Sequence, residues 1–150
     1  MLRNEKGATA VEFALVFPLF ITLLFGIIEF AVILYDKALV THAAREAARA
    51  CVMYNLPPEG GDNILPTNQN FEDAVHNFLG FDAETKSSML ISLGGAGSTE
   101  PIISPNPGAE SGDFSSVTVS YPYTFLMIPN FIPGLANTLT LSSTATMRTE

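Results

Sequence analysis

The sequence predicts an α+β fold in which a long amino-terminal helix packs on a small antiparallel sheet, with one short extra helix. Three patterns in the 150 residues indicate this fold. A helical pattern runs without a stop signal from Ala8 to about Tyr54. Two segments in the last forty residues alternate apolar and hydroxyl side chains, as strands with one buried face do. A short pattern with start and stop signals covers 71–79.

The first half of the long helix, Ala8 to Tyr35, predicts a membrane span. No residue from Phe13 to Ile28 carries a charge. At 1.5 Å per residue the segment reaches about 42 Å, and the hydrocarbon core of a bilayer needs only about 30 Å. Pro18 removes a backbone donor inside this helix and predicts a kink there.

Two carboxylates, Glu12 and Glu29, lie near the two ends of this apolar segment. An ionised carboxylate in a bilayer costs at least a few kcal/mol, so such groups usually face a partner. Two interpretations stay open. Each glutamate lies at a membrane boundary, or each is neutralised by another helix in a bundle of several subunits. Gly26 marks a point where such a helix could pack closely.

The second half of the helix, from Asp36 to Tyr54, is amphipathic and should cover the apolar face of the sheet. Polar side chains such as Arg45 and Glu46 lie off its apolar stripe. Cys51 is the single cysteine, which excludes a disulfide within the chain, and it is expected to act as a small buried hydrophobe. The stripe consists of Val40, Ala43, Ala44, Ala47, Ala50, Cys51 and Tyr54.

The remaining residues predict loops and short elements. Pro57-Pro58 ends the long helix, and a loop follows to Pro66. Asn70 is the expected N-cap of a helix over 71–79, with Gly80 as its stop. We further expect a strand over 88–93, a turn over 94–98, a weak strand over 101–104 and an exposed loop over 105–113.

The last part of the chain carries the clearest strands, over 117–125 and 139–147, joined by an apolar loop at 127–135. Together they predict an antiparallel hairpin with a wide connection. Pro122 lacks a backbone N–H, so it predicts that the first of these strands lies at a sheet edge or bends.

Charge and motifs exclude several classes of function. From Asn55 to Glu150 there are two basic residues against ten acidic ones, and such a surface repels the phosphates of nucleic acids. His42 and His76 are isolated, and the sequence contains no metal, nucleotide or nucleophile motif. We therefore expect no catalytic residue, no cofactor, no metal and no small-molecule substrate. A membrane-tethered enzyme would need its site within 55–113.

The residues around Gly7 resemble a type IV prepilin processing site. In such sites a peptidase of the inner membrane cuts after the glycine, and a glutamate is the fifth residue of the mature chain. Glu12 is fifth when Ala8 is counted as first. More narrowly, residues 7–18 and 26–30 resemble the TadE-like pseudopilins of the tight-adherence (Flp) pilus system. Residues 43–49, 117–122 and 139–150 continue the resemblance.

This resemblance implies a non-enzymatic minor pilin that assists assembly, priming or capping of a pilus. Phe13 departs from the tyrosine that is common after the glutamate in major Flp pilins, which favours a minor subunit. The implied partners are the prepilin peptidase, the major Flp pilin, a second pseudopilin and the assembly platform of the inner membrane. The alternative is a single-pass, membrane-anchored binding or sensor domain unrelated to pili.

The resemblance also divides the chain and assigns roles. Residues 1–7 are the leader, 8–35 the transmembrane and assembly helix, and 36–150 the extracytoplasmic head, which includes the amphipathic continuation of the helix. Cleavage between Gly7 and Ala8 would create an ammonium group that can neutralise Glu12 of a neighbouring helix. Phe13 and Glu29 are the other expected assembly contacts, Glu29 with a partner pseudopilin. The protein would sit in the bacterial inner membrane with a cytoplasmic amino terminus and a periplasmic head, from which it could enter the extracellular pilus.

Overall fold

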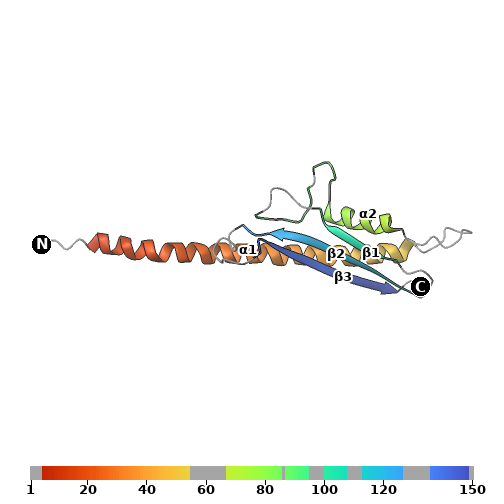
Figure 1. Cartoon of the computed structure of the whole chain (residues 1–150), viewed down its shortest axis with the longest axis horizontal. Helices are drawn as coiled ribbons and strands as arrows, with labels where there is room; N and C mark the ends of the chain where they lie inside the picture. The colour runs from red at the N-terminus through yellow and green to blue at the C-terminus, as the bar shows by residue number, and fades with distance from the viewer. Residues whose placement is uncertain are drawn as a thin grey trace, which may run out of the picture.

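In the computed structural model, a 50-residue helix forms the axis of the molecule, and a small α+β head lies along its second half (Figure 1). The structure describes residues 5–54, 67–85, 87–94, 100–107, 113–126 and 136–148. The elements are α1 (Glu5–Tyr54), α2 (Asn68–Leu79), β1 (Ile102–Asn106), β2 (Phe114–Thr124) and β3 (Thr138–Arg148). The three strands form one antiparallel sheet in the order β1-β2-β3. The predicted fold class is therefore confirmed.

The core lies between the second half of α1, α2 and the inner face of the sheet. The stripe on α1 is buried at Val40, Ala43, Ala44 and Ala47, and Ala48 joins it. Alanines keep this face of the helix thin, so the sheet approaches closely. The polar residues predicted to lie off the stripe are exposed. The rest of the core comes from α2 and the strands: Phe71, Val75, Leu79, Leu90, Val117, Val119, Tyr121, Tyr123 and Leu141.

The short helix α2 begins two residues before the predicted N-cap. Thr67 is the N-cap, and Asn70 instead holds the first turn by accepting a hydrogen bond from the Thr67 backbone N–H at 2.8 Å. The expected stop is confirmed, because Gly80 has the left-handed φ of +60° that favours glycine after a helix.

The strand predicted over 88–93 is wrong. A single bridge joins Asp82 to Ser87, and no strand forms in the described part of this segment. Its backbone donors find other acceptors: the N–H of Ile91 donates to the side chain of Asp36, and the N–H of Gly94 to the carbonyl of Thr124. The segment therefore runs from α2 to the helix and the end of β2 without joining the sheet.

The edge position predicted from Pro122 holds only locally, since β2 is the central strand of the sheet but has no β1 partner at Pro122. The proline still fits, because the sheet has only two strands at that level. Thr124 directs its N–H and C=O away from β3, toward Ser92 and Gly94. Backbone groups two residues apart point the same way, so the Pro122 nitrogen also faces this side. There β1 has already ended at the pair Ile102–Ser120, and no ladder bond is lost.

The other predictions differ in their outcome. The hairpin is confirmed as the pair β2 and β3, and β1 corresponds to the weak strand predicted over 101–104. Helix α1 continues through Pro18, where Thr22 donates a hydrogen bond to the proline carbonyl. Several predictions lie outside the described residues. They concern the loops at 55–66, 95–98, 108–112 and 127–135, the first four residues of the leader, and the side chains of Cys51 and Tyr54.

Candidate functional site

The part of α1 before Glu29 is apolar and largely exposed, and it projects beyond the head (Figure 1). Leu15 is 76% exposed and Leu19 is 73% exposed. By length and composition this helix can cross a membrane, and only 11% of its most apolar stretch is buried. A core helix of a water-soluble protein would be mostly buried. The chain therefore has the form of a single-pass membrane anchor with a head.

Burial along α1 begins at Glu29, which is 1% exposed. Ile33, Asp36 and Val40 follow on the same face at steps of three and four residues. The stretch from Ala8 to Ile28 contains no buried residue and is about 32 Å long at 1.5 Å per residue, which matches the hydrocarbon core. The head therefore contacts α1 about two turns before Tyr35, the predicted end of the transmembrane segment.

The predicted processing and assembly residues lie apart. Gly7, Ala8 and Glu12 are exposed, and the ring of Phe13 lies 5.2 Å from that of Phe17. Glu12 and Glu29 are separated by seventeen residues, about 25 Å along the helix, so the structure does not bring them together. A side chain at Gly26 would meet nothing within 4 Å in this chain. The roles of these residues in processing and assembly stay predictions.

The carboxylate of Glu29 is buried between α1 and the head. Its Oε1 atom accepts a hydrogen bond from the backbone N–H of Leu126, just after β2. The sequence pattern placed Glu29 near a membrane boundary but could not show this acceptor role, because the donor is 97 residues away in the chain.

Sequence reasoning missed a second buried carboxylate, Asp36, which is fully buried seven residues after Glu29. Its Oδ1 atom accepts the N–H of Ile91 at 3.0 Å, and its Oδ2 atom has no hydrogen-bond partner among the described residues. Burial raises the pKa of Asp36 to about 6, against the effect of the Ile91 hydrogen bond. The available signal was the helical phase, since Asp36 continues the stripe that starts at Val40.

Two tyrosines of β2 complete this polar region. The side chains of Tyr121 and Tyr123 are fully buried. Burial, followed by the nearby carboxylates of Glu29 and Asp36, raises the pKa of Tyr123 to about 12. Burial and the Asp36 charge raise the pKa of Tyr121. Both hydroxyls therefore stay protonated at neutral pH.

We expect Asp36→Asn to stabilise the head at pH 8. The pKa is about 6 in the folded protein and 3.8 as the ordinary value, so the folded state binds the proton more tightly. The protonated carboxyl therefore contributes stability that is fully present below about pH 4 and is lost as the pH rises through 6. The loss in the free energy of unfolding is at most about 3 kcal/mol. Asparagine keeps the oxygen that Ile91 needs and never ionises. Melting temperatures of the full chain in detergent, measured from pH 4 to 8, check this.

The exposed Asp73 provides the matched control for that measurement. Asp73→Asn should retain the wild-type loss of stability between pH 4 and 6. If Asp36→Asn also retained it, another group would be responsible for the pH dependence.

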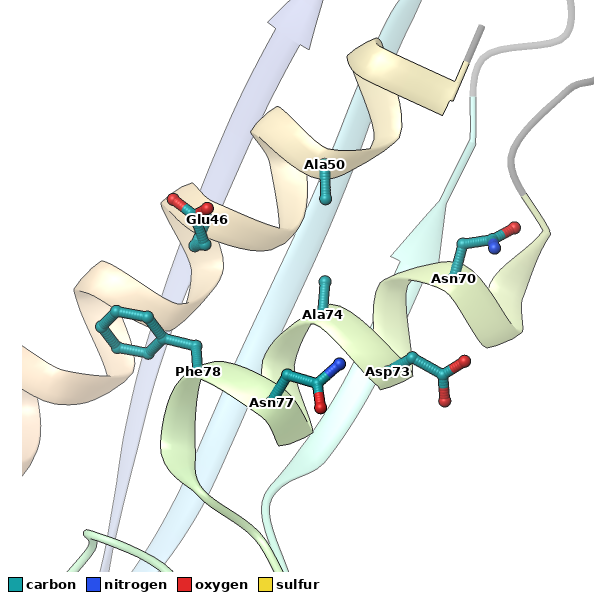
Figure 2. A pocket seen from close by; sticks show the side chains of 7 residues that line it. All are labelled: Glu46, Ala50, Asn70, Asp73, Ala74, Asn77 and Phe78. Atoms are coloured by element: carbon teal, nitrogen blue, oxygen red, sulfur yellow. The ribbon is translucent and has the colours of Figure 1, made fainter. Parts of the chain in front are cut away.

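An open groove of about 570 Å³ lies between the end of α1 and α2. Figure 2 shows the methyl groups of Ala50 and Ala74 facing one another across it, whereas the carboxylates of Glu46 and Asp73 point in different directions. The polar groups therefore do not converge on one point, as they would around a reacting atom or an ion. The groove is lined by Glu46, Ala50, Asn70, Asp73, Ala74, Asn77 and Phe78.

The two histidines lie in different settings. His42 is exposed on α1, whereas His76 on α2 stacks against Phe81 with ring centroids 4.7 Å apart and lies 3.8 Å from Glu100. Within the part of the chain that the structure describes, no group of three or more His, Cys, Asp and Glu side chains could hold a metal ion.

Comparison with known protein families gives a match that lies within the long helix α1. A family model described as TadE-like protein matches residues 7–49, a range that contains Glu12, Phe13 and Glu29 and also the newly found Asp36. No curated protein and no solved structure matches the chain. The family match associates the chain with the Tad pilus machinery. Over residues 7–49, this chain is therefore similar to TadE-like proteins.

Proposed function

We propose that this protein is a non-enzymatic minor pilin, or pseudopilin, that assists assembly, priming or capping of a tight-adherence pilus. The observation that carries the proposal is the exposed apolar half of α1, which lies within the family match and leaves Glu12 without burial in its own chain. Such a helix anchors the subunit in the membrane, and its apolar sides can later pack against other helices in a bundle.

In this proposal a prepilin peptidase cuts between Gly7 and Ala8. The new ammonium group on Ala8 then neutralises Glu12 of a neighbouring subunit. An unpaired carboxylate among lipid chains costs several kcal/mol, whereas an ion pair in the same setting recovers much of that cost. The pair also fixes the axial register of two helices, because it forms only when the start of one helix lies beside the fifth residue of the other.

The proposal places the amino terminus in the cytoplasm and the head in the periplasm of a bacterial inner membrane. The large acidic remainder after the helix supports this orientation, and the flanking Lys and Arg residues favour it only weakly. The major Flp pilin, a second pseudopilin and the assembly platform are the proposed partners. We assign no catalytic role to His42 or His76.

Glu12→Ala tests the proposal. We expect normal removal of the leader but a loss of at least tenfold in surface pili, because an ion pair buried among apolar helices cannot form. Immunoblots of membrane fractions report processing, and electron microscopy of intact cells reports pili. Glu46→Ala, an exposed carboxylate on the same helix, should leave both unchanged. Normal piliation in Glu12→Ala cells would favour the alternative of a plain membrane-anchored binding domain.

A further inference from the structure

The two buried carboxylates of α1 act on the same end of the head. Glu29 and Asp36 are seven residues apart, so they lie on one face of the helix about 10 Å from each other. They are 1% and 0% exposed, respectively. Fully buried carboxylates are rare in proteins and require hydrogen-bond donors.

The donors come from two segments that are far apart in the sequence. Leu126, just beyond β2, donates its N–H to Glu29, and Ile91, in the segment after α2, donates to Asp36. Neither N–H belongs to the strand ladder. A buried backbone donor without an acceptor costs about 1–3 kcal/mol, so each carboxylate satisfies a group that this part of the head cannot satisfy itself.

These two segments are also bonded to each other. The hydroxyl of Ser92 accepts the N–H of Thr124 at 3.0 Å, and the N–H of Gly94 donates to the Thr124 carbonyl. The N–H of Phe125 in turn donates to Asn137, at the entry to β3. Through these bonds, the two carboxylates hold the membrane-proximal end of the sheet and the segment after α2 as one unit.

We propose that Glu29 and Asp36 form an intramolecular clamp that seats the head on α1 where the membrane span ends. In this clamp Glu29 is a positioning residue, and it works as a hydrogen-bond acceptor for Leu126. This differs from the charge-neutralising contact with a partner subunit that the sequence suggests for Glu29. The inference deepens the proposed function, on which its pilus readout rests, but the clamp itself stands on contacts within one chain.

The experiment compares Glu29→Gln with Glu29→Leu in the full-length protein. Glutamine keeps an acceptor oxygen and loses the charge, whereas leucine has a similar volume and no acceptor. Amide hydrogen exchange in detergent micelles, read at Leu126, should be unchanged in Glu29→Gln and about tenfold faster in Glu29→Leu. Exchange at the Leu141 amide in β3 monitors whether the sheet remains folded. Piliation of cells carrying Glu29→Gln is the second readout.

Each outcome decides between the clamp and the partner contact. Normal Leu126 protection and normal piliation in Glu29→Gln support the clamp. Normal protection with loss of pili would overturn it as the function of Glu29, because charge would then be needed outside the chain. Unchanged Leu126 protection in Glu29→Leu would also overturn it. If Glu29→Leu does not fold, the two readouts of Glu29→Gln still decide. Glu12→Ala tests assembly without changing any residue that contacts the head. Its result therefore distinguishes a failure of the proposed function from a failure of the clamp.

Discussion

A methyl group added at Gly94 should strongly destabilise the head. A Cβ atom at this position would lie 1.9 Å from the carbonyl oxygen and 2.4 Å from the carbonyl carbon of Phe125. These are backbone atoms, so no side-chain rotation relieves the clash, and the hydrogen bond from Gly94 to Thr124 must break. We expect Gly94→Ala to cost about 3 kcal/mol or more, a large share of the typical 5–15 kcal/mol of folding stability. Thermal unfolding of the full chain, followed by near-ultraviolet circular dichroism, measures this.

Two other glycines provide matched controls for Gly94→Ala. At Gly80 a Cβ meets nothing within 4 Å, but φ is +60°, so Gly80→Ala should cost about 1 kcal/mol. At Gly26 there is open space and ordinary helical backbone, and alanine should not destabilise the protein. A melting temperature for Gly94→Ala equal to that of Gly26→Ala would contradict the close approach.

Gly7→Leu should leave the protein at its precursor length. The proposed cut follows Gly7, and a branched side chain beside the scissile bond obstructs the approach of a peptidase that accepts glycine there. The effect should be close to complete, and pili should be lost with it, because the ammonium of Ala8 is never formed. Intact-mass spectrometry of protein purified from membranes shows whether residues 1–7 remain.

The control for this prediction is Gly26→Ala, which should be cut normally. Glu12→Ala separates the two stages of the proposal, since it should be cut but not assembled. A mature mass in Gly7→Leu would contradict the processing site. That result would leave the clamp of Glu29 and Asp36 unaffected, because the clamp does not depend on the leader.

The sequence was sufficient for the elements whose signal is periodic. The stripe from Val40 to Ala47 and the alternation around Val117 and Leu141 each repeat many times, so the local pattern reflects which face is buried. The membrane segment was equally clear, because an uncharged apolar run of that length is typical of a helix that spans a bilayer. These patterns also predicted that the helix packs on the sheet, because the apolar stripe on α1 and the apolar face of the sheet are both buried when they contact one another.

The local pattern did not identify contacts between distant residues. Ser88 to Leu93 looks like a strand, but the N–H of Ile91 is satisfied by Asp36, which is 55 residues away. Pro122 suggested an edge, and the actual reason it fits is where β1 ends. The sequence placed Glu29 near a membrane boundary, and Asp36 marked only the start of the amphipathic half of the helix. Only the packed head shows that both are acceptors for its backbone.

The continuity of α1 has a mechanical consequence for the whole molecule. Its 50 residues span about 75 Å without a linker between the membrane segment and the head. The sheet lies along this helix, so a pull along the axis loads the contacts between helix and head together, in shear (Figure 1). Because α1 has no hinge between the two parts, a force applied at the distal end of the head would move the membrane segment almost directly. The subunit is thus built as a stiff rod that transmits force along its axis.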